Sequence, residues 1–375
     1  MYLLEHDAKE LLAAHGIPVP AGCLIEDPSA RPALPAGPWI VKGQIAAGGR
    51  GKAGIIVKAA TPGEVTEQAR AIIGRTVKGR TVESVRVEQQ VNAEREAYIG
   101  LLLDAESGGI RVIVSASGGM EIEQVPHDRI HTAVAPPEPQ ALTDCVRKLA
   151  RQLPGDVGTA VSNAGARLAR VFLGLECMLV EINPLFVLDG GHWIAGDAKV
   201  VTDDNALPRR KELESLVRAR ASAYPDVARK HEHGFDYVEV DPEGEIGLLT
   251  TGAGLSMMLI DELRAAGLKP FNFLDIRTGG LRGETKRLTQ VLQWIGQGQK
   301  VKVLLVNIFA GITDLGEFSR LLVQALDAAK LGTPVVARLV GTNLAAARDT
   351  LAAAGIGLHT DLDAAIAEVR QHLKK

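Results

Sequence analysis

The sequence predicts an α/β protein of two domains, the second of which is a doubly wound parallel sheet. A length of 375 residues exceeds that of a usual single domain. Beyond residue 230, short apolar runs alternate with helical patterns, as they do in right-handed βαβ units. Before it, helices and strands follow no such regular alternation, and a glycine-rich loop joins two of the strands. We therefore expect one domain over 1–230 and a second over 231–375.

The composition is that of an ordinary globular protein, with 46% hydrophobic and 23% charged residues. A net charge of −3 gives no reason to expect nucleic acid or an anionic membrane as a partner, and only 4% of the residues are aromatic. No apolar run reaches transmembrane length, and residues 1–12 have the pattern of an amphipathic helix rather than of a signal peptide. The unrelated spacings of Cys23, Cys145 and Cys177 predict neither a disulfide framework nor a zinc site, which fits a cytoplasmic location.

In the first domain, apolar residues at helical and at alternating spacing predict helices and strands in turn. Thr61-Pro62 is typical of a helix start, and Pro225 lies inside a charged helical pattern. The expected elements are helices over 4–14, 61–73, 139–153, 157–174 and 211–229, strands ending at Lys42 and over 55–58, 84–91, 95–103 and 109–115, and a turn with a short strand over 117–125.

A glycine-rich loop over 43–54 joins two of these strands and holds five glycines in twelve residues. It is neither a Walker A loop nor a Rossmann turn, because no helix follows the glycines. Glycines let backbone N–H groups approach a polyphosphate closely, and Lys42, Arg50 and Lys52 add positive charge. The alternative interpretation is a mobile hairpin with solvated cations.

The stretch 179–199 reads as two strands around a turn centred on Gly190. Asn183 lies seven residues before that centre and Asp197 seven after it, so the two would face each other with Cα atoms about 4.5–5.5 Å apart. Glu181 lies on the same face of the strand as Asn183. Oxygen ligands of this kind suit Mg²⁺. The alternative is an ordinary hairpin with polar residues near its end.

Two further pairs of residues have open interpretations. Glu88 and Glu96 lie at the end of one strand and the start of the next, where carboxylates could accept hydrogen bonds from ribose hydroxyls, although each alone is typical of a solvated surface acid. His231 and His233 have a spacing that a metal site could use, but an exposed linker is the interpretation we favour.

The second domain alternates strands with helices. Two of its βα turns, Thr250–Gly254 and Asn307–Thr313, set small residues at a helix N-terminus, where free N–H groups can bind phosphate or carboxylate. A plain tight turn is the alternative for each. The expected strands are 245–251, 271–276, 301–308, 334–339 and 356–359, and the expected helices are 254–267, 284–297, 315–330, 343–354 and 362–373.

Six stretches carry a resemblance to a known family: Val41–Gln44, Gly48–Gly54, Glu181–Leu185, Gly252–Leu255, Asn272–Asp275 and Val306–Phe309. In the order and the residues of these stretches, the chain resembles the β-subunits of the ADP-forming succinate–CoA ligases, a family that extends to malate–CoA ligases. The resemblance covers nearly the whole chain. It implies an ATP-grasp nucleotide-binding domain over 1–230, followed by a flavodoxin-like CoA-ligase domain over 231–375.

The resemblance also implies the site residues. The nucleotide would bind Lys42, Gly49, Arg50, Gly51, Glu88 and Glu96. Mg²⁺ would bind Asn183 and Asp197, the pair that the hairpin brings together, and Glu181 would orient a phosphorylated histidine. The carboxylate and phosphohistidine site would be lined by Thr251, Gly311, Ile312 and Thr313.

The reaction implied by the resemblance has three steps: ATP phosphorylates a histidine, the phosphohistidine makes an acyl phosphate from a small di-acid, and CoA then forms the thioester. None of the nine histidines lies in a glycine-flanked catalytic loop, and no G-x-G-x-x-G Rossmann turn, with a helix after the glycines, is present for CoA. We therefore expect an α-subunit that carries the phosphohistidine and the CoA site, in an αβ or α₂β₂ assembly.

Departures from the family pattern fall at the carboxylate end of the site. Thr251 stands where the family commonly has Asn, Thr313-Asp314 replaces an Arg-Cys-Asp stretch, and Arg277 and Arg282 stand in a run that is commonly glycine. Arginines match carboxylates bidentately, so both are candidates for substrate contact. Succinate is the expected di-acid, with malate or another substituted di-acid as the alternative. ATP is expected over GTP. A nucleotide-binding regulatory subunit without catalysis, or an ATP-grasp ligase with an amine acceptor, are alternatives of other classes.

Overall fold

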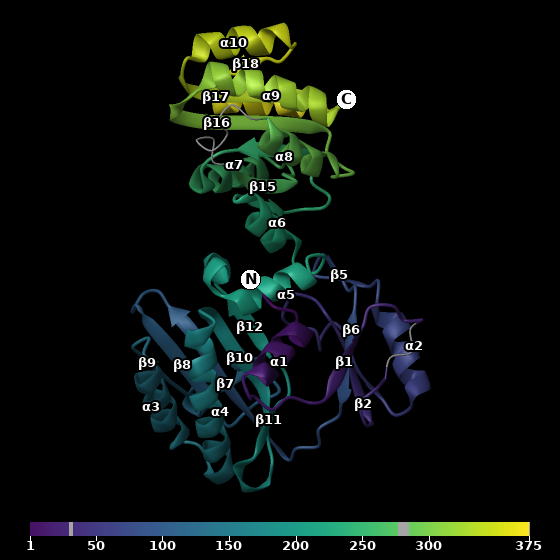
Figure 1. Ribbon diagram of the computed structural model, residues 1–375, viewed down its shortest axis with the longest axis vertical. Helices are drawn as coiled ribbons and strands as arrows, with labels where there is room; N and C mark the ends of the chain where they lie inside the picture. The colour runs from purple at the N-terminus through teal and green to yellow at the C-terminus, as the bar shows by residue number, and fades with distance from the viewer. Residues whose placement is uncertain (30–32, 277–284, 375) are drawn as a thin grey trace. The chain divides into compact units, whose positions relative to one another are not determined.

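The computed structural model describes residues 1–29, 33–276 and 285–374 (Figure 1). The chain forms two compact units, Met1–Leu216 and Val217–Lys375. The division lies 14 residues before the expected boundary at 230 (230 − 216 = 14). None of the helices in the described ranges is both long and apolar enough to span a bilayer.

The first unit contains a small antiparallel sheet in the order β1-β6-β2-β3. Helix α2 packs against it, and the Thr61 side chain caps this helix by accepting a hydrogen bond from the Glu64 amide. Apolar residues of the sheet and of α2 form one buried cluster that includes Val41, Val87 and Ile72. The elements are β1 (Gly22–Ile25), β2 (Trp39–Gly43), β3 (Ile56–Ala59), α2 (Pro62–Ile72) and β6 (Val85–Gln89), with a short hairpin of β4 (Thr76–Val77) and β5 (Arg80–Thr81).

A second antiparallel sheet of the same unit runs in the order β11-β10-β7-β8-β9, and β12 also pairs with β10. Helices α3 and α4 cover one face of it (Figure 1). Gly165 lets these two helices approach closely, because a Cβ there would lie 2.2 Å from a methyl group of Val146. The elements are β7 (Arg95–Asp104), β8 (Gly109–Ser115), β9 (Ile130–Ala135), α3 (Pro139–Ala150), α4 (Gly155–Gly174), β10 (Cys177–Val187), β11 (Trp193–Ala195) and β12 (Lys199–Thr202).

The register of the central hairpin confirms the predicted turn centre. Leu185 pairs with Ala195 and Glu181 pairs with Lys199, so the two residue numbers add to 380 on both sides of positions 183 and 197. The Gly196 amide donates to the Pro184 carbonyl at 2.9 Å in the same register. Asn183 therefore lies opposite Asp197 across the hairpin, as a turn centred on Gly190 requires.

Helix α1 (Glu5–Ala14) lies between the two sheets of the first unit (Figure 1). The residues before it are fixed on β12, because the Leu3 amide donates to the Val200 carbonyl at 2.9 Å and the N-terminal ammonium group pairs with Asp204. The start of α1 is thereby held in one position, and its side chains reach both sheets.

The second unit is the predicted doubly wound parallel sheet, in the order β14-β16-β17-β18. Successive residues of the strands point to opposite faces, so Leu304 packs in a cluster with α8, α9 and α10, and Leu305 packs in a cluster with α7 and α11. The elements are β14 (Ile246–Thr250), α7 (Ala253–Ala265), α8 (Lys286–Gly296), β16 (Val303–Asp314), α9 (Leu315–Ala329), β17 (Val335–Thr342), α10 (Leu344–Ala353), β18 (Leu358–His359) and α11 (Leu362–Leu373).

Strand β15 (Asn272–Asp275) runs beside β14, but the middle of this contact is made by a side chain. Phe271 and Ile276 donate backbone hydrogen bonds to β14, whereas the Asn272 amide group bonds the N–H and the C=O of Leu248 at 2.8 and 2.9 Å. On its other edge, β15 pairs antiparallel with β13 (Asp236–Glu239), a strand that was not predicted from the sequence.

Three sequence predictions were wrong in detail. The stretch 117–125 holds the 3₁₀ turn η1 (Ile122–Gln124) instead of a strand. The helix expected over 211–229 is two helices, α5 (Lys211–Ala219) and α6 (Pro225–His233), because Pro225 lacks an N–H group and occupies the first turn. His231 and His233 lie in the last turn of α6 instead of in a linker. Further 3₁₀ turns are η2 (His127–Arg129), η3 (Asp189–Gly191) and η4 (Asp204–Arg209).

Candidate functional site

A cavity of about 520 Å³ lies in the first unit. Its wall joins the glycine loop to the central hairpin and to the start of α1. Among the predicted site residues, the cavity brings together Gly49, Arg50, Gly51, Glu181, Asn183 and Asp197.

The glycine loop is bonded at its middle and at its end to side chains from outside the loop, and its cation Arg50 is buried instead of solvated. The Arg75 guanidinium donates to the carbonyls of Ala53 and Gly54, both at 3.0 Å. Lys78 donates to the Gly48 carbonyl at 2.7 Å. These bonds satisfy loop carbonyls from outside the loop and hold it beside the cavity.

Arg50 connects the loop to the hairpin. Its guanidinium donates to both carboxylate oxygens of Asp197 at 2.8 and 2.9 Å and makes an ion pair with Glu5 at 2.6 Å. Burial works against the charge of Arg50, but Asp197 and Glu5 outweigh it and raise the pKa of the guanidinium. The predicted metal ligand Asp197 is thus paired with the predicted phosphate ligand Arg50.

Asn183 is oriented by the turn after β8. Its Oδ1 accepts from the Gly119 amide and its Nδ2 donates to the Met120 carbonyl, both at 2.8 Å. The carbonyl oxygen of an amide has two lone pairs, so Oδ1 keeps one acceptor site. Asn183 and Asp197 both line the cavity and both offer oxygen, which is the donor chemistry that Mg²⁺ prefers. The residues present therefore fit a magnesium ion.

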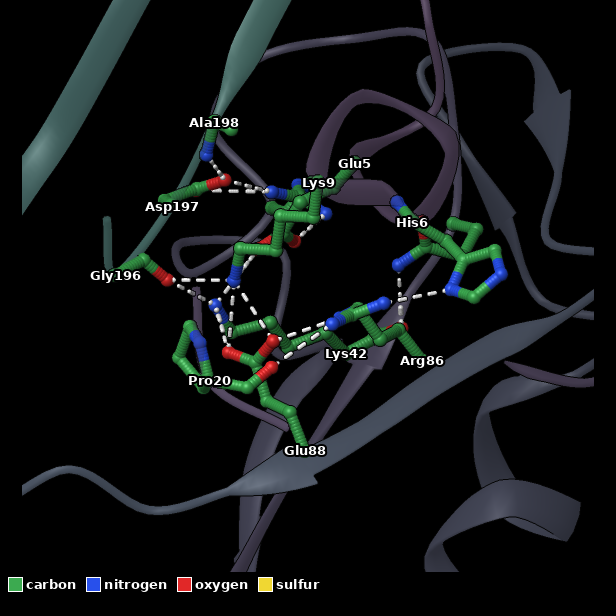
Figure 2. A network of polar contacts seen from close by, with 12 residues as sticks. Glu5, His6, Lys9, Pro20, Lys42, Arg86, Glu88, Gly196, Asp197 and Ala198 are labelled. Carbon is green, nitrogen blue, oxygen red and sulfur yellow. Dashed lines mark hydrogen bonds and ion pairs between the residues drawn. The ribbon is translucent and has the colours of Figure 1, made fainter. Parts of the chain in front are cut away.

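Lys42 is buried in a group of charges behind the cavity wall. Its Nζ donates to Glu5 and to the Gly196 carbonyl at 2.8 Å, and it pairs with Glu88 at 2.7 Å (Figure 2). Burial works to lower the pKa of Lys42, but the nearby carboxylates of Glu5, Glu88 and Asp197 raise it overall. Lys42 is thus a cation held just behind the wall.

The two predicted ribose ligands have different surroundings. Glu88 is 2% exposed and also accepts from Arg86 Nε at 2.8 Å, so its interpretation as a solvated surface acid is wrong. Glu96 is half-buried on β7 and packs against Gly119, where a Cβ would lie 2.0 Å from Glu96 Oε2. Gly119 thus allows the turn that holds Asn183 to approach Glu96. Neither glutamate is part of the cavity wall.

Glu181 lies on β10, two residues before Asn183 and on the same face of the strand. It pairs with Lys199 of β12. Burial raises the pKa of the Glu181 carboxyl above its ordinary value. Lys199 opposes this shift, whereas the charge of Asp197 reinforces it. Tyr98 forms a side-chain hydrogen bond to this carboxyl group. The surroundings of Glu181 therefore disfavour its ionised form.

Glu181→Gln is expected to change stability and activity in opposite directions. Because the folded-state pKa is raised, the ionised form of Glu181 costs stability, and this cost appears as the pH rises from the unfolded pKa through the folded one. The variant should therefore have the higher melting temperature at pH 7 and lose that advantage near pH 4. If Glu181 orients the phosphohistidine, phosphoryl transfer should fall by roughly tenfold to a hundredfold. Melting curves at the two pH values and phosphorylation rates check both parts; a lower melting temperature at pH 7 would contradict the first.

In the second unit, Thr251 is half-buried in the turn between β14 and α7. The turn is held by Asp275, which accepts from the Gly252 amide at 2.8 Å, and Gly252 has the positive φ of 83° that glycine adopts without strain. Thr251 thus precedes a helix N-terminus, as predicted. Arg277 and Arg282 lie outside the described residues.

The prediction of a βα turn over Asn307–Thr313 was wrong, because strand β16 continues through these residues to Asp314. Ala310 pairs with Gly341 and Asp314 pairs with Thr342, so Gly311, Ile312 and Thr313 bulge out of the ladder. Ile312 is fully exposed.

Asp314 occupies the N-terminus of α9. Its carboxylate accepts from the Glu317 amide at 2.9 Å and from Asn343 Nδ2 at 3.1 Å. The backbone hydrogen bond from Glu317, followed by the one from the Asn343 side chain, lowers the pKa of Asp314. The positive end of this helix is therefore compensated by a carboxylate of the chain itself.

Comparison with known proteins defines the family. Residues 2–187 match the ATP-grasp domain family and residues 249–371 match the CoA-ligase family. The chain is 40% identical over 362 residues to the succinate–CoA ligase [ADP-forming] subunit beta of Chloroflexus aurantiacus, with 94% of this chain and 93% of the relative covered. The chain belongs to the β-subunits of the succinate–CoA ligases. An Archaeoglobus fulgidus ADP-forming subunit is 38% identical over 351 residues, covering 92% and 90%, and a Thermus thermophilus GDP-forming subunit is 37% identical over 350 residues, covering 91% of each chain.

The solved structures agree on the fold. ATP citrate lyase from Methanothrix soehngenii aligns with a TM-score of 0.72 over 100% of this chain and 99% of that one, at 18% identity. The prediction of an ATP-grasp domain followed by a CoA-ligase domain is confirmed, and so is the prediction of an ADP-forming carboxylate–CoA ligase β-subunit.

Two charged residues of α1 belong to the site but were not predicted from the sequence. Glu5 pairs with both Lys42 and Arg50, and Lys9 is fully buried beside it. The available signal was an acid and a lysine four residues apart on the apolar side of a helix, which is an unusual place for two charges.

Proposed function

We propose that this chain is the nucleotide-binding subunit of a succinate–CoA ligase and transfers the γ-phosphoryl group of Mg–ATP to a histidine of a separate α-subunit. One observation carries the proposal: a single cavity collects the glycine loop, Arg50, and the oxygen pair of Asn183 and Asp197. The names of the relatives support succinate as the acid and ADP as the product.

The proposed binding requires an exchange of partners. Arg50 would leave Asp197 for phosphate oxygens, while the amides of Gly49 and Gly51 lie along the same loop. Lys42 would turn from Glu5 and Glu88 to the phosphates, and Glu96 would accept from the ribose. Asn183 and Asp197 would hold Mg²⁺, which when bound neutralises charge on the phosphates. Positioning of the reacting groups and electrostatic stabilisation by cations are the main sources of catalysis in phosphoryl transfer.

The phosphorylated histidine is proposed to come from the partner. None of the nine histidines of the chain is among the residues that line the cavity. We therefore propose an α-subunit that supplies the phosphohistidine and the CoA site, in an αβ or α₂β₂ assembly, with Glu181 orienting that histidine and Thr251 and the 311–313 bulge meeting the carboxylate.

The purified chain alone is expected to form no acyl-CoA, and addition of its α-subunit is expected to restore the reaction fully. The measurement is thioester formation from ATP, CoA and succinate, with the chain alone, the α-subunit alone and the reconstituted complex. GTP in place of ATP should support a lower rate. Thioester formation by the chain alone would rule out the partner requirement, and equal rates with GTP would rule out the nucleotide preference.

A second candidate acid follows from Thr251. A threonine offers one hydroxyl group where the family commonly has an amide, so it leaves more room and a different hydrogen-bond pattern beside the helix N-terminus. This favours a hydroxylated di-acid such as malate. The reconstituted complex decides between the two acids by kcat/KM, because the preferred substrate has the higher value.

A further inference from the structure

Two lysines share one set of acceptors behind the cavity. Lys9 Nζ lies 2.7 Å from Glu5 Oε1, 2.7 Å from Glu88 Oε2 and 2.8 Å from the Gly196 carbonyl. Lys42 Nζ contacts the same three groups at 2.8, 2.7 and 2.8 Å. Figure 2 shows both amino groups converging on Glu5, Glu88 and Gly196. The two lysines and the two glutamates form a neutral cluster, which we call the four-charge cluster.

The contacts of Lys9 are those of an ammonium group. Three acceptor groups lie within 2.8 Å of its nitrogen, and only an ammonium group has three protons to donate. Its side chain is 0% exposed and is absent from the cavity wall, so it is not placed to touch a nucleotide. Glu5, in contrast, lines the cavity. Lys9 can therefore affect the cavity only through the groups that it holds.

Nucleotide binding would take two of the three cations that contact Glu5 away from it. In the described part of the chain, Glu5 has three cationic partners, Lys9, Lys42 and Arg50. Under the proposed function, Lys42 and Arg50 both turn to phosphate oxygens. Lys9 then stays as the cation of Glu5, while Glu88 keeps Lys9 and Arg86. A buried carboxylate without a cation is costly, so the departure of Lys42 and Arg50 depends on Lys9.

Lys9 also holds the turn that carries the metal-ligand candidate. It donates to the Gly196 carbonyl, and Gly196 directly precedes Asp197. The same ammonium group thus joins α1, β6 and the Gly196–Asp197 turn. When Lys42 leaves this carbonyl, Lys9 keeps it bonded.

We propose that Lys9 is a positioning residue of the phosphoryl-transfer site, which holds Glu5, Glu88 and the Gly196 carbonyl so that Lys42 and Arg50 can turn to the nucleotide. The proposal rests on the proposed function of the cavity as an Mg–ATP site. Without Lys9, Lys42 becomes the amino group that both carboxylates need, and it stays behind the wall.

The test compares four forms of the reconstituted complex with wild type: Lys9→Met, Glu5→Gln, the double variant Lys9→Met/Glu5→Gln, and the control Lys58→Met. Lys58 is exposed on β3 and is not part of the cavity wall, so the control makes the same chemical change at a lysine outside the cluster. Equilibrium binding of Mg–ATP and the rate of α-subunit phosphorylation are measured, together with KM for succinate and the melting temperature.

Lys9→Met should raise the Kd for Mg–ATP by roughly tenfold to a hundredfold, which is the effect of one charged hydrogen bond. KM for succinate should stay within about twofold, since the variant alters only the release of Lys42 and Arg50. The double variant should return the Kd to within about threefold of wild type, because removal of one carboxylate charge restores the balance of the cluster. Glu5→Gln alone should bind Mg–ATP as tightly as wild type or more tightly. Lys58→Met should match wild type in every measurement.

Each other outcome has a defined meaning. A double variant that binds no better than Lys9→Met, or a Glu5→Gln variant that binds at least tenfold more weakly than wild type, overturns the positioning role and leaves Lys9 as a structural lysine. If Lys9→Met does not fold, the other two variants decide: a double variant that binds Mg–ATP at least tenfold more weakly than wild type, or a Glu5→Gln variant that does so, overturns the positioning role. If wild type itself binds no Mg–ATP, the proposed function fails, and the positioning role fails with it.

Discussion

Asp197→Ala is expected to abolish ATP-dependent phosphorylation of the α-subunit histidine, with a loss in rate of about a thousandfold or more. The carboxylate has two tasks that alanine cannot perform. It is one of the two proposed Mg²⁺ ligands at the cavity, and it holds Arg50 through two hydrogen bonds. Loss of the first task removes the charge that a bound metal would bring to the phosphates.

The fold of the Asp197→Ala variant should persist. The hairpin is held by backbone pairing on both sides of position 197, and Arg50 keeps its ion pair with Glu5. A matched control is Asp189→Ala, which changes an exposed aspartate in the turn of the same hairpin and should leave the rate near that of wild type. Asp197→Asn keeps an oxygen ligand without the charge, so its rate should lie between the two. Phosphorylation by Asp197→Ala at the rate of wild type would refute the assignment of this residue.

The central hairpin could be predicted to the residue because its register depends on local rules. Once the turn is centred on Gly190, antiparallel pairing determines which residues face each other, and 183 and 197 follow by counting. The partner of Asp197 does not follow in this way. Arg50 is 147 residues away in the sequence, and only the packing of the two sheets in the first unit brings its guanidinium to the hairpin.

Helix α1 illustrates the same limit. Its length and its end were predictable from hydrophobic spacing, and so was the neighbourhood of Glu5 and Lys9, which are four residues apart. Their burial was not predictable, because it depends on Glu88 of strand β6, which is 79 residues from Lys9 in the sequence. Charges on the inner face of an amphipathic helix are usually excluded by desolvation, so their presence there indicates partners from elsewhere in the chain.

The second unit shows where local patterns mislead. Glycine and small residues over 307–313 predicted a turn, yet the register of β17 extends β16 to Asp314 and leaves 311–313 as a bulge. The bulge depends on a neighbouring strand and not on its own residues. The carboxylate-binding prediction for Gly311, Ile312 and Thr313 therefore stays a prediction, now placed on a bulge.

Lys42→Met is expected to lower the rate of α-subunit phosphorylation by about a hundredfold to a thousandfold while leaving the melting temperature close to that of wild type. A lysine that contacts transferring phosphate oxygens supplies a charged hydrogen bond and part of the electrostatic stabilisation of the transition state. The small effect on stability follows from the four-charge cluster. After the substitution, Lys9 still bonds Glu5, Glu88 and the Gly196 carbonyl, so neither buried carboxylate loses its last cation.

A comparison of Lys42→Met with Lys9→Met distinguishes the roles of the two lysines, although both lysines contact the same acceptors. Lys42→Met removes the amino group that is proposed to reach the phosphates, so addition of Glu5→Gln should not restore its rate. Lys9→Met removes the cation that stays behind, so the same second change should restore binding. Two measurements on the two single and two double variants give the comparison: the Kd for Mg–ATP and the phosphorylation rate at saturating Mg–ATP. Recovery of Lys42→Met by Glu5→Gln would mean that Lys42 serves only the charge balance of the cluster, and the phosphate contact would then belong to Arg50 and the glycine loop alone.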